Sequence, residues 1–333
     1  MAGIFNTNQI KKANTDAVRR VLRSGNGVTI AEIVQATHLS VPTVSRIIEE
    51  MVASGEVLNC PEEVATGGRR ARQDRLNGAF RYILCVYFDR HQIWYNLCNA
   101  VGYSTEKGEL PVEDYRHPEL IDSLVRQMQQ DYPALRAVSI GVPAWVINDE
   151  LQVIHEYPGF DRVDFHTQIE QRYHLPCRVT NDLKAIAAGY YSSHFPDRRI
   201  SLCCFYLSDS GPGAGLIVDG KLFPGMAGFA GEIGFIPVGD GKNVKKLLQS
   251  PDSTMAERTA AAAAATVALV SLLNPEYLLF CTHGDRLPPV RDIVAECRRL
   301  LPEKALPQFI ETADYHTYFL KGLHSIALPL VIP

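Results

Sequence analysis

Paired cysteine motifs, long apolar runs and a strong excess of one charge are all missing from this sequence. Its eight cysteines never form a C-x-x-C pair, so their spacing favours reduced core thiols over disulfides or metal ligands. The sequence predicts no stretch long and apolar enough to span a bilayer, and residues 1–13 lack the apolar segment of a secretory signal. The sequence therefore predicts a cytoplasmic protein without a membrane partner.

Charge is nearly balanced but unevenly placed along the 333 residues. Residues 1–77 contain 10 Lys and Arg against 8 Asp and Glu, a net +2, and the remainder carries the −6 that brings the total to −4. An excess this small does not identify a nucleic-acid binder by itself. The length exceeds what one hydrophobic core usually organises, so two or three compact units are expected.

The first 77 residues contain the boundary signals of consecutive short helices. Asn14 and Thr15 are predicted to cap a first helix that Gly25 ends. Thr29 and Glu32 form a T-x-x-E capping box, which predicts the start of a second helix. A tight connection is expected over residues 37–40, before a third helix begins.

The third helix has the strongest pattern of the three. Ser40 is predicted to cap it, Pro42 falls in its first turn, and Gly55 ends it. Apolar residues recur at helical spacing, which predicts a buried stripe made of Val44, Ile47, Ile48, Met51 and Val52. Two short strands over residues 56–59 and 72–77 should follow and form a wing.

The polar side of this helix suits DNA. A recognition helix presents its N-terminal residues to base edges and phosphates, and the candidates here are Pro42, Thr43, Ser45 and Arg46. Arg69 and Arg70, in the loop of the wing, are candidate phosphate or minor-groove contacts. We therefore predict a winged helix-turn-helix over residues 1–77 that binds double-stranded DNA at a palindromic operator. The alternative is a three-helix module that only contacts another protein.

From residue 78 onward the sequence alternates between strand and helix patterns, which indicates an α/β fold with two lobes. Strands are expected at 82–88, 93–98 and 137–142, with a helix at 118–132. A second set should have strands at 177–180, 201–207 and 215–218, with helices at 183–192 and 256–273. The run Ala260–Ala265 is expected in a helix packed between lobes or subunits.

Several segments resemble the ROK (repressor, open reading frame, kinase) family. They are VPTVSRIIEEMVASGEV with ATGGRRAR in the N-terminal part, and SIGVPAWV, VTNDLKAIAAGYY and GAGLIVDGKLFPGMAGFAGEIGFIP further on. The resemblance implies an actin-like domain of two α/β lobes, the first over 78–178 with a C-terminal helix near 313–333 packed on it, the second over 179–312. It also implies a sugar-controlled repressor of carbohydrate-related genes that forms a homodimer or homotetramer.

The same resemblance implies candidate effector contacts at Asn181, Asp182 and Glu232, in a cleft between the lobes. Carboxylate and amide oxygens accept hydrogen bonds from sugar hydroxyls, so the residue types fit the task. Asn and Asp are also favoured helix caps, and capping is a second interpretation of Asn181 and Asp182. In family kinases the residue matching Asp182 acts as the general base.

Three departures from the family pattern argue against a kinase. The glycine-rich phosphate turn is replaced by residues 86–91, where Tyr87 takes the place of the leading Asp. The later glycine pair is replaced by residues 281–284. The zinc-binding His is Phe235, and residues 236–280 contain neither Cys nor His. We therefore expect no catalytic residues, no ATP and no metal or other cofactor.

Two alternatives to a sugar-responsive regulator remain open at this level. One is a ROK sugar kinase with an appended DNA-binding module. The other is a regulator whose second part no longer binds sugar and serves oligomerisation or a protein partner. Phe235 in place of the His leaves any bound sugar with one hydrogen bond fewer, and its ring could stack on an apolar sugar face instead.

Overall fold

The computed structural model describes residues 7–22, 27–64, 71–89, 91–152, 163–196, 198–208, 211–284 and 286–332. The chain separates into two units. The first comprises Met1–Arg81 with Asn99–Tyr103, and the second comprises Tyr82–Cys98 with Ser104–Pro333. The first unit thus extends a few residues beyond the predicted boundary at residue 77.

The first unit has three helices and a small antiparallel sheet in its described part. The helices are α1 (Thr7–Leu22), α2 (Ile30–Thr37) and α3 (Val41–Ala53). The strands are β1 (Val28–Thr29), β2 (Val57–Val64) and β3 (Ala71–Leu76), in the order β1-β3-β2. The expected start of α1 at Asn14 or Thr15 is wrong. Residues 7–13 contain no Gly or Pro, so the helix continues through them, and the Thr15 hydroxyl donates to the Lys11 carbonyl (2.9 Å) inside it.

The caps of α2 and α3 are confirmed. Thr29 accepts from the Glu32 amide (3.3 Å), and the Glu32 carboxylate accepts from the Thr29 amide (2.8 Å), which completes the capping box. Ser40 accepts from the Thr43 amide (3.4 Å). The three helices enclose an apolar core whose members include Val18, Leu22, Ile33, Val44, Ile47 and Ile48.

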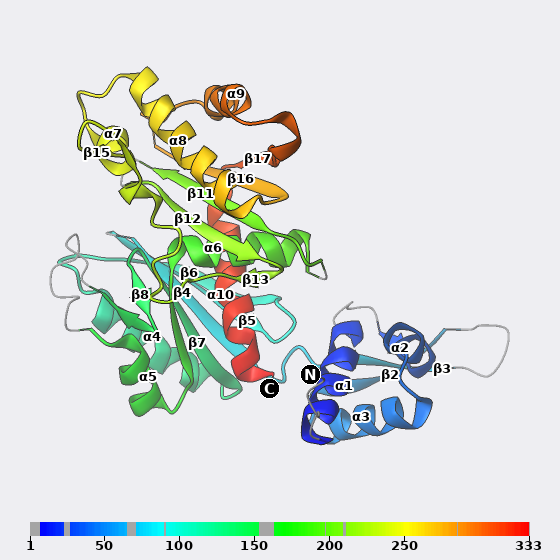
Figure 1. The fold of residues 1–333 in the computed structure, drawn as a ribbon. Helices are drawn as coiled ribbons and strands as arrows, with labels where there is room; N and C mark the ends of the chain where they lie inside the picture. Colours follow the sequence, from blue (N-terminus) through cyan, green and yellow to red (C-terminus); the bar gives the residue numbers. More distant parts are fainter. Residues whose placement is uncertain are drawn as a thin grey trace. The chain divides into compact units, whose positions relative to one another are not determined.

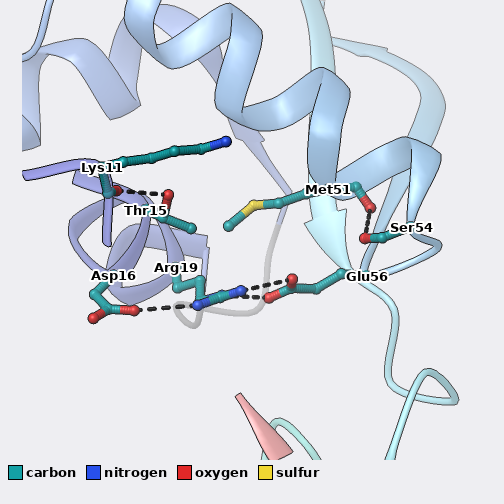
Figure 2. Close-up of polar contacts among 7 residues, drawn as sticks. All are labelled: Lys11, Thr15, Asp16, Arg19, Met51, Ser54 and Glu56. Carbon is teal, nitrogen blue, oxygen red and sulfur yellow. Dashed lines mark hydrogen bonds and ion pairs between the residues drawn. The ribbon is translucent and has the colours of Figure 1, made fainter. Parts of the chain in front are cut away.

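A nearly buried ion pair fixes the start of the wing to α1 (Figure 2). Arg19 is 9% and Glu56 7% exposed, with Arg19 Nε 2.6 Å from Glu56 Oε1. Arg19 also contacts Asp16 (3.2 Å). Glu56 lies between α3 and β2, so the pair joins three elements. Removing one partner of such a pair usually costs about 3–5 kcal/mol, because the other charge stays buried.

The second unit begins with a five-stranded sheet in the order β10-β7-β4-β5-β6 (Figure 1). Its strands are β4 (Tyr82–Phe88), β5 (Gln92–Asn99), β6 (Ser104–Pro111), β7 (Leu135–Val142) and β10 (Cys177–Asn181). Helices α4 (His117–Asp131) and α5 (Phe165–Tyr173) cover one face through an apolar core. The prediction that 177–180 belongs to the second set is wrong, because β10 pairs in parallel with β7.

A second five-stranded sheet has the order β13-β12-β11-β16-β17. Its strands are β11 (Leu202–Ser208), β12 (Gly213–Val218), β13 (Lys221–Leu222), β16 (Tyr277–His283) and β17 (Gln308–Thr312). Short elements complete the unit: β8 (Val146–Ile147), β9 (Glu150–Leu151), β14 (Pro237–Gly239), β15 (Lys242–Asn243) and the 3-10 helices η2 (Ile233–Phe235) and η3 (Glu303–Ala305).

Helices α7 (Val244–Gln249), α8 (Met255–Leu273) and α9 (Val290–Leu300) pack on this second sheet. The alanine run lies in α8, and Ala262, Ala263 and Ala265 are buried in the core of this lobe. The expected packing between lobes is therefore wrong, whereas the expected packing between subunits stays a prediction. By length and composition alone α8 could cross a membrane, which corrects the sequence prediction. Its buried alanines and its contacts with α7 and α9 are those of a core helix.

Helices α6 (Asp182–His194) and α10 (Tyr315–Val331) run against each other and share a core with residues of both sheets (Figure 1). Helix α10 also lies against β4 and β7 of the first sheet. At the crossing the backbones touch. A Cβ on Gly189 would lie 1.8 Å from the Tyr318 carbonyl oxygen, and one on Gly322 would lie 1.8 Å from the Ala185 carbonyl oxygen.

We predict that Gly189→Ala and Gly322→Ala each destabilise the protein by about 1–3 kcal/mol, because the added methyl group forces the two helix backbones apart. Helix propensity alone would give the opposite sign, since Gly→Ala in a helix usually stabilises by about 0.5–1 kcal/mol. Denaturant unfolding of the full chain measures the difference. A stability equal to or above the wild type would show that the crossing is not tight.

Candidate DNA-binding and effector sites

The leading end of α3 presents the predicted DNA contacts. Pro42 and Arg46 are exposed, while Thr43 and Ser45 are half-buried. Within the described part of the chain the Arg46 guanidinium makes no hydrogen bond or ion pair, so it is available to a base edge. Arg69 and Arg70 lie outside the described residues, between β2 and β3.

Two contacts set the orientation of α3. The Ser40 and Thr43 hydroxyls share a hydrogen bond (2.8 Å) at its start, and Lys11 of α1 binds Glu50 (2.9 Å) near its end. The acidic end is therefore held by α1. Sequence reasoning missed Val41, which is 55% exposed at the first position of α3. An exposed apolar group there suits contact with a thymine methyl group.

Asn181 caps α6 and is nearly buried, at 8% exposure. Its side-chain oxygen accepts from the amides of Leu183 (3.1 Å) and Lys184 (3.3 Å). Its side-chain nitrogen donates to the Ala144 carbonyl (3.0 Å) and to Asp182 Oδ1 (2.9 Å). Asn181 is therefore the N-terminal cap of α6, as the capping interpretation predicted. Asn181 also orients the carboxylate of Asp182.

The second predicted contact, Asp182, lies beside the third, Glu232. Asp182 Oδ1 also accepts from the Leu183 amide (2.8 Å). Burial and the nearby Glu232 carboxylate together raise the pKa of Asp182 to about 7, although the hydrogen bond from the Leu183 amide and the charge of Lys184 act to lower it. Burial also raises the pKa of Glu232, opposed by Lys184 and Lys245. Two carboxyl groups whose burial favours protonation thus come together, from β10–α6 and from the loop after β13.

Lys184 completes this cluster, and the sequence analysis did not assign it a role. Its ammonium donates to the Gly228 carbonyl, and it is 4% exposed. Burial lowers its pKa, while Glu232 and Asp182 act to raise it. The signal in the sequence was a single lysine followed directly by the apolar residues Ala185–Ala188. A lysine in such a setting needs buried partners.

Glu232 is placed by the tight loop that precedes η2. Gly231 has φ +94°, and a Cβ there would lie 1.9 Å from the Ala214 carbonyl oxygen, so only glycine fits. The Glu232 amide donates to the Phe229 carbonyl (3.2 Å), and the Phe235 amide donates to the Glu232 carbonyl (3.2 Å). These two hydrogen bonds fix the backbone on both sides of Glu232.

The place of the phosphate turn between β4 and β5 is filled by this chain's own groups. The Asp89 carboxylate accepts from the amides of His91 (2.8 Å) and Gln92 (3.0 Å), so an internal anion takes the amides that a phosphate would need. The Tyr87 ring stacks on Trp94 at 5.0 Å and its hydroxyl shares a hydrogen bond with His316. A groove of about 590 Å³ with an aromatic floor lies beside them.

The position expected for the zinc-binding His is Phe235, which is 63% exposed. Among the described residues no group of three or more His, Cys, Asp or Glu side chains lies close enough to hold a metal ion. The residues around Phe235 therefore do not fit the zinc site that the resemblance implies.

The raised pKa of Asp182 makes a prediction about stability. Between the ordinary value of 3.8 and the folded value of about 7, the folded state binds a proton that the unfolded chain has released. This contribution to the free energy of unfolding is present at low pH and is lost as the pH rises through that window.

Asp182→Asn removes this dependence, so its Tm should gain on the wild-type Tm as the pH rises from about 5 to about 8. Thermal unfolding followed by circular dichroism at each pH tests it. Asp219→Asn, which changes an exposed aspartate in the turn after β12, is the matched control. A Tm difference that does not change with pH would contradict the assignment.

Comparisons with known proteins identify the family to which this chain belongs. The ROK family matches residues 84–256, just over half of the chain. The xylose repressor of Caldicellulosiruptor bescii is 27% identical over 242 residues, which cover 68% of this chain and 58% of that protein. The transcriptional dual regulator NagC of Escherichia coli K12 is 25% identical over 251 residues, covering 71% and 60%. The chain thus spans about three fifths of the length of these relatives.

Solved structures share the fold. A ROK transcriptional regulator described as a homologue of E. coli Mlc superposes with a TM-score of 0.73 at 16% identity, over 97% of this chain and 98% of that one. A ROK glucokinase from Streptomyces griseus, solved with glucose and AMPPNP, has a TM-score of 0.55 at 17% identity, over 74% and 98%. The α/β fold with an N-terminal helical unit, predicted from the sequence, is confirmed. This chain belongs to the ROK family.

Proposed function

We propose that this protein is a sequence-specific DNA-binding regulator, a repressor of carbohydrate-related genes, whose DNA affinity is controlled by a sugar-like effector at Asp182 and Glu232. The DNA-binding part of this proposal rests on the N-terminal end of α3. Arg46 is exposed there and has no hydrogen-bond or ion-pair partner in the described part of the chain. The repressor relatives support the same assignment. A palindromic operator and a homodimer or homotetramer follow from the usual symmetry of such regulators.

The second half of the proposal rests on the acidic cluster. Asp182 and Glu232 come from separate elements and are near enough for the Glu232 charge to raise the pKa of Asp182, whose carboxylate accepts a hydrogen bond from Asn181. Carboxyl groups that are easily protonated can both donate and accept hydrogen bonds, as sugar hydroxyls require. Lys184 keeps the pair from being an uncompensated buried charge.

We propose that the protein is not a kinase, although kinases share the family and the fold. A general base at Asp182 transfers nothing without a phosphoryl donor. At the turn where the nucleotide phosphates would lie, Asp89 takes the backbone amides and the Tyr87 ring stacks on Trp94. The other alternative is a second unit that binds only proteins. It does not account for the proximity of Asp182, Lys184 and Glu232.

Effector control requires that the ligand bind the DNA-competent and DNA-incompetent states with different affinities, a coupling typically of about 1–3 kcal/mol. Two hydrogen bonds connect the start of α6 to both sheets, so the affinity of a ligand bound there depends on how the sheets are arranged. Asn181 binds the Ala144 carbonyl after β7 of the first sheet, and Lys184 binds the Gly228 carbonyl in the loop after β13 of the second. A ligand on Asp182 and Glu232 acts on both connections.

We expect Arg46→Ala to weaken binding to the preferred DNA sequence by about 1–3 kcal/mol and to relax base preference at one position. Arg69→Ala and Arg70→Ala should weaken all sequences about equally and lower the slope of log affinity against log salt by nearly one unit each. DNA selected from a random pool by the full chain supplies the probe for fluorescence anisotropy.

Arg20→Ala is the matched control, because it removes an equal, exposed charge from α1 and leaves α3 unchanged. If Arg46→Ala and Arg20→Ala lower affinity equally and leave base preference intact, α3 is not the recognition helix. If deletion of residues 1–77 leaves the footprint unchanged, the first unit does not bind DNA at all.

A further inference from the structure

Two aromatic rings, Phe229 and Phe235, pack against each other in the loop that carries Glu232. Glu232 closes a turn onto the Phe229 carbonyl, and Phe235 closes the next turn onto the Glu232 carbonyl, each over 3.2 Å. These two turns bring together side chains that are six residues apart in sequence. The two phenyl centroids are 5.5 Å apart, with the ring planes tilted by 44°.

Trp145, in the segment after β7, adds a third ring to this pair. Its ring meets Phe229 edge-on with centroids 5.3 Å apart, and its indole N–H donates to the Ala227 carbonyl (2.7 Å). The indole is fixed by that bond. Three aromatic rings thus continue from Phe235 through Phe229 to Trp145, next to the polar cluster of Asp182, Lys184 and Glu232.

Two of these rings are unusually open for a folded domain. Phe229 is 43% and Phe235 63% exposed. Large apolar side chains left open next to buried polar groups are typical of ligand sites, where apolar walls surround a few polar groups that fix orientation. The neighbouring Lys184 and Glu232 are such groups.

The spacing of the rings decides which ligand shape they fit. At 5.5 Å the Phe229 and Phe235 centroids are too close for a sugar ring to be sandwiched between them, because it needs van der Waals contact on both faces. The rings therefore offer an angled apolar surface, because Phe235 is tilted by 44° and Trp145 by 74° relative to the Phe229 ring. An apolar group of ring size can stack on one of these rings while its edge contacts the next.

We propose that this site selects a glycoside with a ring-sized apolar aglycone over a free monosaccharide. The inference rests on the proposed function, that a carbohydrate binds at Asp182 and Glu232. The sugar hydroxyls bond to these two carboxyl groups, and the aglycone lies on Phe229 and Trp145. Phe229 and Phe235 are then specificity-determining residues, which act on the part of the ligand that the carboxyl groups do not touch.

Isothermal titration of the full chain with paired methyl and phenyl glycosides of glucose, galactose, mannose, xylose and N-acetylglucosamine tests this proposal. For the sugar that binds, the phenyl glycoside should bind about tenfold or more tightly than its methyl partner, because part of an aromatic ring is removed from water. Phe229→Ala should bring the ratio near one and change the methyl affinity little. Glu232→Gln should weaken both partners equally, so their ratio persists.

Leu272→Ala is the matched control, because it removes another exposed apolar side chain, on α8, and should leave the ratio unchanged. Thermal unfolding confirms that each variant is folded. If glycosides bind and respond to Glu232→Gln, but phenyl and methyl partners bind alike, the aromatic surface is not a subsite and the proposed function stands. If no glycoside of the panel binds the wild type, both proposals are overturned.

Discussion

The close crossing of α6 and α10 is the constraint on which the second unit depends. The two backbones touch at Gly189 and Gly322, where a Cβ would lie 1.8 Å from a carbonyl oxygen of the other helix. This contact lets one core receive residues of both sheets, Ile83 and Cys85 from the first and Leu202 and Cys204 from the second. The start of α6 is thereby fixed between the two sheets.

The candidate effector site follows from that placement. Asn181 ends β10 and begins α6, so the residues after it emerge at the junction of the first sheet and the helix. One helical turn then makes bonds in two directions, from Asn181 to Ala144 and from Lys184 to Gly228. Glu232, from the loop after β13 of the second sheet, then completes the candidate site. Both sheets therefore contribute to it.

The first unit is built for a different task, which is to hold one helix in one orientation. The buried pair Arg19–Glu56 ties α1 to the start of the wing (Figure 2). The exposed pair Lys11–Glu50 ties α1 to the far end of α3. An exposed pair such as Lys11–Glu50 adds little stability, whereas the buried pair is costly to break. We expect α3 to present the same face whether or not an effector is bound.

What the sequence predicted correctly was local. The capping box of Thr29 and Glu32 and the cap at Ser40 depend on residues three apart, and both are present. The motifs that carry the family resemblance also indicated Asp182 and Glu232, whose role in effector binding stays a prediction. What it missed depends on contacts between distant segments. The pairing of β10 with β7 is set by tertiary packing, and the Trp145–Phe229 contact joins residues 84 positions apart.

Lys184 shows why part of the site was missed although its motif was recognised. Helical spacing places the residue in the first turn of α6, but only the fold brings Gly228 and Glu232 to its ammonium group. The start of α1 was missed for a different reason. Asn14 and Thr15 are good caps, but residues 7–13 contain nothing that stops a helix, so it continues through them.

The central claim is that one chain couples carbohydrate binding in the second unit to DNA binding in the first. The most direct test is the affinity of the full chain for its selected DNA, measured by fluorescence anisotropy with and without a saturating glycoside, for the wild type and for Glu232→Gln. We predict a change of about 5- to 150-fold in the wild type and a smaller change in Glu232→Gln at the same glycoside concentration, because the variant binds the glycoside more weakly. An unchanged DNA affinity in the wild type with the glycoside demonstrably bound would contradict it.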